Sequence, residues 1–507
     1  MVSRVLSLGI TGIDGYLVTV EVDIGPGLPC FEIVGLPGAA VREARERVRA
    51  AVSNSGLTFP VRRIVANLAP GDVPKAGALY DLPLAVGILA ADGQVEEGCL
   101  AEWVFLGELS LDGAIRPVRG VLPMCLSLPP LGLRRAVVPS ANTAEAGAVP
   151  GLEAVGLATL RDVAGALRAG RLPRGAGAGD VSPGKAVNHG GIEDVEGQDR
   201  AKRALEIAAA GGHNVLLIGP PGAGKTMLAR RLPGILPPLT PAERLEISKI
   251  HSVAGLLPPG VGLVRARPFR APHHTASVAG LAGGGLPPVP GELSLAHRGV
   301  LFLDELPEFR RESLELLRQP LEEGSVRLAR KGLTVNFPAR FSLVAAMNPC
   351  PCGYLGDRRK ACRCGLGQIE RYRRRISGPL LDRVDMRVLV PRPGGKGTAP
   401  PAGRPPSSAE VGERVAAARR RQSERLAPVG LTTNAEMDAA HLREPSLVGL
   451  GPVARAFLDD AVLSTGLSYR ARDRVIRLAR TIADLEGREE VEVLHVAEAL
   501  SHRGEVD

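Results

Sequence analysis

The chain has 507 residues and a formal net charge of +9 with a pI near 9.4, so its length suits about three domains and its charge favours polyanions such as nucleic acid or phosphates. No run approaches the roughly 20 apolar residues of a membrane span, and the N-terminus lacks the basic segment and apolar run of a signal peptide. We therefore expect a cytoplasmic protein with no membrane partner. In that reducing compartment, clustered cysteines indicate a metal site more than disulfides.

The first predicted domain, residues 1–168, alternates strand-like and helical patterns. Residues 16–24 (YLVTVEVDI) and 62–70 (RRIVANLAP) are strand-like, whereas residues 42–56 (REARERVRAAVSNSG) predict a basic helix that ends in glycine. Small residues, glycine and proline then dominate residues 169–190, a composition that predicts a linker.

The second predicted domain, residues 191–392, opens as a helix, a buried strand (NVLLIG), a Gly-rich loop and another helix. A Pro- and Gly-rich loop follows at residues 393–410. Residues 411–507 are helical in pattern, with no strong strand run. The three parts together predict an α/β protein whose C-terminal part is a helical lid.

A phosphate-binding motif lies in the Gly-rich loop, where residues 219–226 (GPPGAGKT) match G-x-x-x-x-G-K-[ST] between a strand and a helix. The glycines allow backbone N–H groups to converge on phosphates, and the helix that begins there adds its positive dipole end. Lys225 would reach the β- and γ-phosphates, and the Thr226 hydroxyl would bind Mg²⁺. The residues predicted to bind the nucleotide are Gly219, Pro220, Pro221, Gly222, Ala223, Gly224, Lys225, Thr226 and Asp304.

Two carboxylates end the next strongly apolar strand, in residues 299–306 (GVLFLDEL). In open α/β sheets ligands bind at the carboxyl ends of the strands. We expect Asp304 to hold Mg²⁺ together with Thr226, and Glu305 to polarise the water that attacks the γ-phosphate. ATP and Mg²⁺ are therefore the predicted cofactors.

Three further polar residues could complete the site. Asn348 ends another strand (FSLVAAMNP), where its side chain could contact the γ-phosphate or the attacking water. Arg383 could act in trans on a neighbour's nucleotide, or could form salt bridges with the adjacent aspartates. Arginines at helical spacing in the C-terminal part, beginning with Arg470, could reach the nucleotide from the lid or could line a solvated face.

Four of the seven cysteines fall in the pattern C-x-C-x₉-C-x-C within residues 348–364 (NPCPCGYLGDRRKACRC). Four thiolates are a plausible tetrahedral Zn²⁺ site, although C-x₂-C spacing is more usual, and unligated thiols or a redox pair are the alternatives. A metal there would tie down the loop between Asn348 and the Arg383 segment. The predicted ligands are Cys350, Cys352, Cys362 and Cys364.

These motifs in this order resemble an AAA+ ATPase. The long segment at residues 267–305 resembles the magnesium-chelatase branch of that superfamily, and residues 65–89 with 107–124 resemble the Lon-protease-like domain of the YifB/ComM family. The resemblance covers nearly the whole chain. It implies a Lon-protease-like α+β domain, an AAA+ P-loop αβα core and a helical lid.

The resemblance also implies roles for individual residues. Asn348 is similar to sensor 1, Arg383 to the arginine finger and Arg470 to sensor 2. Residues 272–290 resemble a pore-facing helix-2 insert, and residues 326–337 resemble a hairpin whose tip carries Arg330, Lys331 and Gly332. Two basic residues at such a tip suit a DNA backbone and would contact it without reading the base sequence.

The partners implied are a homo-hexamer, DNA (forked, single-stranded or four-way) and recombination proteins. The function implied is DNA branch migration in homologous recombination and natural transformation. Two alternatives remain: a protein unfoldase, whose pore loops usually carry an aromatic residue, and a magnesium-chelatase motor. The insert here is Gly-, Ala- and Pro-rich, and the N-terminal domain argues against a chelatase.

The N-terminal domain is predicted to lack protease chemistry. Lon-type proteases place a serine soon after a PKDG-like turn, whereas PKAGALYDLP here has Leu79, Tyr80 and Asp81. Residues 119–124 (RGVLPM) also lack the lysine of the second motif. Without a nucleophile and a basic partner, covalent catalysis cannot begin. We expect a scaffold or a DNA-binding role instead.

Overall fold

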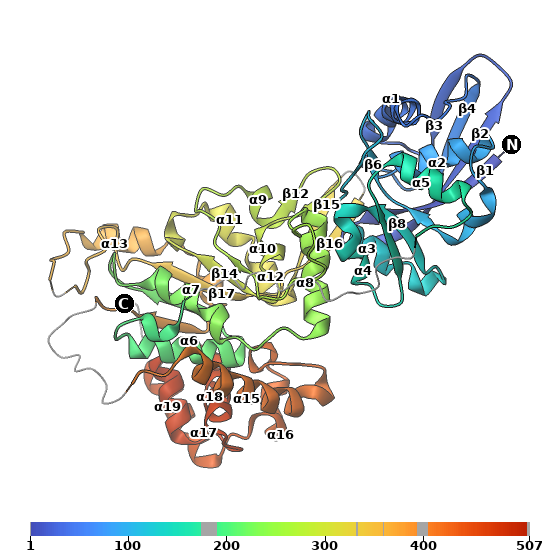
Figure 1. Cartoon of the computed structure of the whole chain (residues 1–507). Coiled ribbons are helices and arrows are strands. Elements are labelled where there is room, and N and C mark those ends of the chain that lie inside the picture. The colour runs from blue at the N-terminus through green and yellow to red at the C-terminus, as the bar shows by residue number, and fades with distance from the viewer. Residues whose placement is uncertain (1, 174–189, 331–332, 358, 393–403, 504–507) are drawn as a thin grey trace.

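The protein is described by a computed structural model that covers residues 2–173, 190–330, 333–357, 359–392 and 404–503. Three parts follow one another along the chain: an N-terminal mixed sheet with helices, a central parallel sheet with helices, and a helical C-terminal part (Figure 1). This arrangement confirms the predicted fold class. No helix in the described ranges is long and apolar enough to cross a membrane.

The N-terminal part is built on a seven-stranded sheet with the order β3-β4-β2-β1-β5-β8-β9. Its longest strands form an antiparallel hairpin, and alternate residues face the core, as a half-buried strand requires. The strand predictions at residues 16–24 and 62–70 are confirmed as β2 and β4. The strands are β1 (Val2–Thr11), β2 (Asp14–Gly25), β3 (Cys30–Val34), β4 (Arg63–Ala69), β5 (Val104–Phe105), β8 (Arg135–Pro139) and β9 (Glu153–Leu157).

Five helices cover this sheet, and a short pair of strands, β6 (Glu108–Leu109) and β7 (Ile115–Arg116), extends from it. The predicted basic helix is confirmed as α1. Every residue of α2 is buried, because DLPLAVGILAA has no charged residue after its first position and can pack on all sides. The helices are α1 (Ala39–Asn54), α2 (Asp81–Ala91), α3 (Val121–Leu126), α4 (Thr143–Gly147) and α5 (Leu160–Arg168).

The central part contains a five-stranded sheet with the order β11-β14-β17-β10-β18, in which every neighbouring pair is parallel. All carboxyl ends therefore meet at one edge, where ligands bind in such sheets. The core strands are short apolar runs with both faces covered. The strands are β11 (Phe269–Arg270), β14 (Val300–Leu303), β17 (Ser342–Met347), β10 (Val215–Ile218) and β18 (Met386–Leu389).

Alternate residues of these strands enter two separate cores. In β10, Val215 and Leu217 join the core that contains the C-terminal helices, whereas Leu216 and Ile218 join the core on the opposite face. The first core also contains α6 (Asp199–Gly211) and α7 (Lys225–Ile235). The second core is closed by short elements, namely α9 (Val278–Ala282), α10 (Glu292–Leu295), α11 (Arg311–Glu315), α12 (Arg318–Glu323), α13 (Leu366–Arg373) and α14 (Gly378–Leu381).

Two hairpins project from the central part. The insert region forms the two-residue strands β12 (Gly283–Gly284) and β13 (Val289–Pro290), and the second hairpin pairs β15 (Ser325–Arg330) with β16 (Leu333–Pro338). Its tip residues Lys331 and Gly332 lie outside the described residues.

The C-terminal lid packs on α6 and α7 through its long helices. Its first helix begins at Ser408, three residues before the predicted start, because the Ser407 hydroxyl accepts the N–H of Glu410 in a capping box. Residues 393–403 of the predicted loop, and residues 174–189 of the predicted linker, lie outside the described residues. The helices are α15 (Ser408–Leu426), α16 (Pro445–Val448), α17 (Pro452–Thr465), α18 (Tyr469–Glu486) and α19 (Val493–Ser501).

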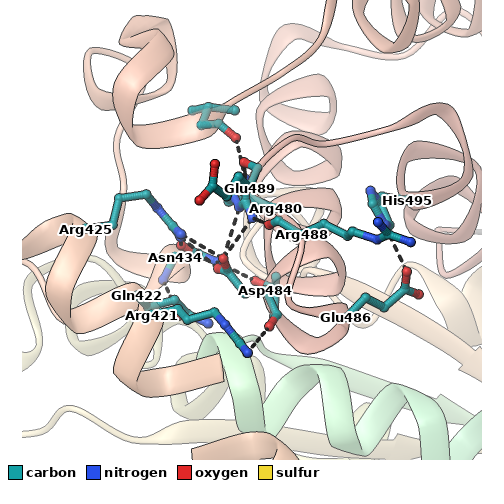
Figure 2. A network of polar contacts seen from close by, with 12 residues as sticks. Arg421, Gln422, Arg425, Asn434, Arg480, Asp484, Glu486, Arg488, Glu489 and His495 are labelled. Carbon is teal, nitrogen blue, oxygen red and sulfur yellow. Dashed lines mark hydrogen bonds and ion pairs between the residues drawn. The ribbon is translucent and has the colours of Figure 1, made fainter. Parts of the chain in front are cut away.

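A buried polar network joins the lid helices (Figure 2). The carboxylate of Asp484 on α18 accepts two hydrogen bonds of 2.7 and 2.8 Å from Arg425 on α15, and a third of 2.8 Å from Asn434. Arg480, which is 1% exposed, lies 2.9 Å from the same carboxylate. It also donates to the carbonyl of Val448, at the end of α16, and to that of Glu489, in the loop after α18. The network therefore links three segments of the lid that are distant in sequence.

The N-terminal part contacts the central part through α3 and α8 (Pro241–Ala254). The buried Glu145 carboxylate accepts hydrogen bonds from Leu122 N–H and from the Ser252 hydroxyl of α8, and Gly120 N–H donates to the Ser252 carbonyl at 3.1 Å. Lys249 of α8 lies 3.2 Å from Asp14, the first residue of β2. These contacts join the N-terminal sheet to the core of the molecule despite the predicted linker.

Candidate active site

The phosphate-binding loop runs from the end of β10 to the start of α7. Gly222 and Gly224 have φ angles of 77° and 88°, in the left-handed region that favours glycine. A Cβ on Gly219 would lie 2.1 Å from the Val390 carbonyl oxygen, so a side chain there would displace the loop from β18. The glycine positions of the motif therefore follow from backbone conformation and close packing.

Lys225 is buried at the start of α7. Its Nζ donates to the carbonyl oxygens of Gly219 and Pro220 at 2.6 and 3.0 Å, and to Oδ1 of Asn348 at 3.2 Å. Burial lowers the pKa of Lys225, while the nearby Asp304 and Glu305 act in the opposite direction. The ammonium group is thus held inside the loop. A bound polyphosphate would offer it charged phosphate oxygens as hydrogen-bond acceptors in place of the neutral carbonyl oxygens.

The predicted magnesium ligands lie together. Thr226 Oγ1 donates to Asp304 Oδ2 at 2.7 Å, which joins the start of α7 to the end of β14. A hydroxyl and a carboxylate are hard oxygen donors, and Mg²⁺ is usually bound by one or two such protein ligands with water and phosphate oxygens. The donor set therefore fits a magnesium–nucleotide complex.

Glu305 has an unusual backbone. Its φ of 52° is left-handed for a residue with a side chain, a conformation that costs about 1–3 kcal/mol and often marks a functional site. The turn exposes its side chain, of which 55% is accessible, beside the phosphate-binding loop. Its N–H donates to Asp304 Oδ1 at 2.9 Å, so the backbone of Glu305 orients the Asp304 carboxylate.

His274 is a candidate site residue that the sequence did not single out. Its Nδ1 lies 3.5 Å from Oε2 of Glu305, and its ring packs against His273 and Phe309. It follows β11, the strand beside β14, so adjacent strand ends bring it to the carboxyl edge. The only sequence signal was a histidine pair inside the insert, and that pair gave no reason to choose Glu305 as its partner.

Arg383 and Arg470 lie near the edge of the central sheet that is opposite to the edge occupied by the residues described so far. The Arg383 carbonyl accepts from Asn214 Nδ2 at 3.0 Å, and Asn214 directly precedes β10. At about 3.3 Å per residue, the strand from Asn214 to Gly219 spans about 17 Å, more than an extended arginine side chain reaches. Arg383 therefore lies near the amino ends of the strands, whereas Lys225 lies near their carboxyl ends.

The side chain of Arg383 pairs with Glu322 of α12 and not with the adjacent aspartates. Those aspartates face α18 instead: Arg470 and Arg474 both lie 3.9 Å from Asp382. The Nε of Arg383 is buried without a hydrogen-bond partner. The salt bridge to Asp382 or Asp385 that was the alternative for Arg383 is thus absent from the described structure.

A cavity of about 1000 Å³ is lined by these arginines. Its walls come from α8, the amino ends of the central strands, and the lid. Among the described residues, no member of the phosphate-binding loop lines it. The structure thus brings Lys225, Thr226, Asp304, Glu305 and Asn348 together, and separates them from Arg383 and Arg470.

The residues proposed to contact DNA lie on the projecting β15–β16 hairpin. Arg330, at the end of β15, is exposed, and so is Arg327 on the same strand. Lys331 lies outside the described residues.

The cysteine cluster is assembled as predicted in space. The sulfur atoms of Cys350, Cys352, Cys362 and Cys364 all lie within 4.8 Å of one another.

The turn in the N-terminal part where Lon-type enzymes carry their serine is occupied by structural residues. Asp81 is fully buried, and its carboxylate accepts hydrogen bonds from Arg47 at 2.7 and 3.0 Å. Tyr80 and Leu79 are buried beside it, and the buried Lys75 donates to the Pro70 carbonyl. None of these side chains is free to act as a nucleophile.

We therefore expect the purified protein to leave casein intact during incubation with ATP and Mg²⁺. An assay by gel electrophoresis over several hours would check this, with a Lys225→Ala variant as the control for any ATP-dependent contaminant. Degradation by the unaltered protein, absent from the variant, would show that the N-terminal part has proteolytic chemistry.

A parallel sheet in this order, with a phosphate-binding loop after β10, carboxylates after β14 and a polar residue after β17, defines a P-loop ATPase of the AAA+ class. Three family models match the chain: "Magnesium chelatase, subunit ChlI" at residues 191–397, "Subunit ChlI of Mg-chelatase" at 20–142, and "Magnesium chelatase, subunit ChlI C-terminal" at 405–503.

Relatives match over nearly the full length. An uncharacterized protein of Mycobacterium tuberculosis is 45% identical over 509 residues, covering 99% of this chain and 98% of the relative. The uncharacterized protein YifB of Escherichia coli is 43% identical over 494 residues (97% and 95%), and the competence protein ComM of Haemophilus influenzae is 43% identical over 504 residues (98% and 96%). The chain belongs to the magnesium-chelatase-like AAA+ family that includes YifB and ComM.

The match at residues 20–142 bears on the expectation that the N-terminal domain argues against a chelatase motor. The model that matches there also carries the name of the chelatase subunit. The presence of the N-terminal part therefore does not by itself separate this chain from chelatase motors.

Proposed function

We propose that this protein is a ring-forming ATPase that couples ATP hydrolysis to movement on DNA, driving branch migration in homologous recombination and natural transformation. The observation that carries the proposal is the separation of two sets of residues across one sheet. One set can bind and cleave a nucleotide, and the other contains arginines that cannot reach it within the same chain.

The first set supplies nucleotide binding and hydrolysis. Lys225 would bind the β- and γ-phosphates, and Thr226 and Asp304 would hold Mg²⁺, which neutralises phosphate charge when bound. Glu305 would orient the attacking water and accept its proton, with His274 restraining the carboxylate. Asn348, whose Oδ1 accepts a hydrogen bond from Lys225 Nζ, would contact the γ-phosphate and sense its position.

The second set requires a neighbour. Arg383 lies near the amino edge of the sheet and is paired with the carboxylate of Glu322, a contact that a phosphate group could replace. Arg470 is 74% exposed and lines the same cavity. If identical subunits pack head to tail, the amino edge of one meets the nucleotide of the next, and closure generates a ring. We propose a homo-hexamer in which both arginines act in trans.

DNA is supported as the substrate by charge and by a relative. The formal charge is +9, and exposed arginines lie on a projecting hairpin suited to a phosphodiester backbone. ComM is named a competence protein, and competence concerns DNA uptake. Recombination proteins are the further partners that this reading proposes.

A protein-remodelling ATPase is the second candidate. The insert exposes Leu286 and Val278, apolar side chains that could grip a polypeptide. Neither is aromatic, whereas the hairpin beside them carries arginine. Stimulation of ATP hydrolysis by an unfolded protein and not by DNA would favour this candidate, and stimulation by a porphyrin with partner subunits would favour a chelatase motor.

An ATPase assay with single-stranded, duplex, forked and four-way DNA tests the proposed function. We expect forked or four-way DNA to stimulate hydrolysis, and DNA affinity to fall steeply between 50 and 200 mM salt, by roughly 10³-fold or more if six or more phosphates are contacted. Arg330→Ala should weaken binding to every DNA equally. It should also reduce the slope of log affinity against log salt concentration by about one, the contribution of one phosphate contact.

Arg443→Ala is the matched control, because it removes an exposed arginine from the lid and not from the hairpin. It should leave DNA binding unchanged. No stimulation by any DNA structure at low salt would contradict the DNA proposal while leaving the ATPase assignment intact.

A further inference from the structure

The four clustered cysteines are contributed by two segments that flank a short loop. Cys350 and Cys352 lie in the turn after β17, and Cys362 and Cys364 precede α13. Cys350 is fully buried, and the other three are partly exposed. The cluster is therefore anchored in the core through Cys350 and reaches the surface through the other three cysteines.

The distances between the sulfur atoms fit a shared metal ion. Cys350 Sγ lies 3.4 Å from Cys352 Sγ and 3.6 Å from Cys362 Sγ, and Cys352 Sγ lies 3.6 Å from Cys362 Sγ. A disulfide needs about 2.05 Å. A tetrahedral zinc ion with Zn–S bonds of about 2.3 Å places its ligands about 3.8 Å apart. The spacing of these three sulfur atoms is close to that tetrahedral edge, and Cys364 Sγ lies within 4.8 Å of each of them.

The loop between the cysteine pairs is organised by contacts of its own. The Asp357 carboxylate accepts the N–H groups of Arg359 and Lys360 at 2.7 and 3.3 Å, and lies 3.1 Å from Arg392 Nε. Lys360 Nζ lies 4.0 Å from the centre of the Tyr354 ring. The Cys364 N–H also points to Cys362 Sγ at 3.4 Å. These contacts order the described part of the loop that joins the two cysteine pairs.

The first cysteine pair also packs on the active site. Gly353, directly after Cys352, has a φ of 82°, and a Cβ on it would lie 2.6 Å from Pro221 Cδ and 3.7 Å from Asn348 Cγ. Pro221 is in the phosphate-binding loop. The turn that carries Cys350 and Cys352 is therefore in direct contact with both the loop and Asn348.

We propose that Cys350, Cys352, Cys362 and Cys364 bind one structural Zn²⁺, and that the metal-bound turn braces the phosphate-binding loop. Each thiol loses its proton as its S–Zn bond forms, so loading releases up to four protons and involves no change of oxidation state. Because the turn touches Pro221, loss of the metal should weaken nucleotide binding itself, and not only steps after binding.

Metal analysis of the purified full-length protein tests the site independently of any activity. We expect about one zinc per chain, and less than about a tenth of that in Cys362→Ser/Cys364→Ser, because two thiolates alone hold zinc weakly. Cys30→Ser, which removes an exposed thiol on β3, should retain the metal. Metal-free protein with four titratable cluster thiols, or with a disulfide in the cluster, would overturn the proposal.

A cobalt-loaded protein gives a second measurement if the double variant fails to fold. Co²⁺ in place of zinc should show the visible absorption of a tetrahedral site with strong sulfur-to-cobalt charge transfer. Cys364→His keeps a ligand, so it should retain the metal and lose part of that charge-transfer intensity. An octahedral spectrum for the unaltered protein would refute the tetrathiolate site.

Two glycine variants test whether the metal-bound turn supports the phosphate-binding loop. Gly353→Ala and Gly356→Ala both place a side chain at a left-handed φ, of 82° and 75°, but only Gly353 has a neighbour within 4 Å. Gly353→Ala should weaken binding of a non-hydrolysable ATP analogue about 10-fold, equivalent to about 1.4 kcal/mol. Gly356→Ala should weaken it less than about two-fold. Equal affinities in the two variants, with zinc retained in both, would refute the brace and leave the metal site standing.

Discussion

Replacing Arg383 with alanine is expected to lower the kcat of ATP hydrolysis by roughly 10³-fold or more, the usual effect of removing an arginine finger. The nucleotide affinity should change little, since the phosphate-binding loop of the same chain lies at the other edge of the sheet. Steady-state ATPase kinetics, together with binding of an ATP analogue, would measure the two effects separately. Arg374→Ala, which removes an arginine whose side chain is 82% exposed directly after α13, is the control and should retain full activity.

Mixing variants distinguishes action in trans from a structural effect. Lys225→Ala subunits cannot bind phosphates, but they retain Arg383; Arg383→Ala subunits have the reverse defect. In a mixed ring some interfaces combine the intact Lys225 of one chain with the intact Arg383 of its neighbour. Activity should therefore return in mixtures of two inactive variants. If every mixing ratio stays inactive, Arg383 serves only to hold α12 through Glu322.

The second large effect is expected in the lid. Asp484→Ala removes the carboxylate that neutralises Arg425 and Arg480 and leaves both guanidinium groups in a buried site without a charged partner (Figure 2). Breaking a buried ion pair in this way costs about 3–5 kcal/mol. The free energy of local opening of the lid should fall by that amount. We expect faster amide hydrogen exchange in α15 and α18, with little change in the N-terminal sheet.

Asp459→Ala is the matched control for the lid, because its ion pair with Arg472 is solvent-exposed and should be worth less than about 1 kcal/mol. If the amides of α15 and α18 exchange equally slowly in the two variants, the polar network does not stabilise the lid. Since α15 and α18 also pack on α6, the stronger variant should lower ATPase activity indirectly. Activity alone would therefore not separate its effect from that of Arg383→Ala, whereas hydrogen exchange does.

The residues proposed to bind the nucleotide could be selected from the sequence because they lie in local patterns. The phosphate-binding motif consists of eight contiguous residues whose glycines are required by backbone conformation or close packing, and Asp304 and Asn348 each follow an apolar strand. Parallel strands bring such ends to one edge whatever the loops between them do. The partnership of His274 with Glu305 could not be predicted, because it depends on which strand lies beside β14, and an insert separates the two residues.

The sequence by itself determined the class of the protein, the AAA+ fold, the phosphate-binding motif and the four cysteines as a set. Each of these depends on a contiguous pattern or on strand order that the pattern implies. Only the tertiary structure decided that Arg383 and Arg470 lie across the sheet from Lys225, that Arg383 pairs with Glu322, and that the cysteine turn rests on Pro221. The physical reason is the same in each case: the residues concerned are far apart in sequence, and only the packing of strands and helices sets the distance between them.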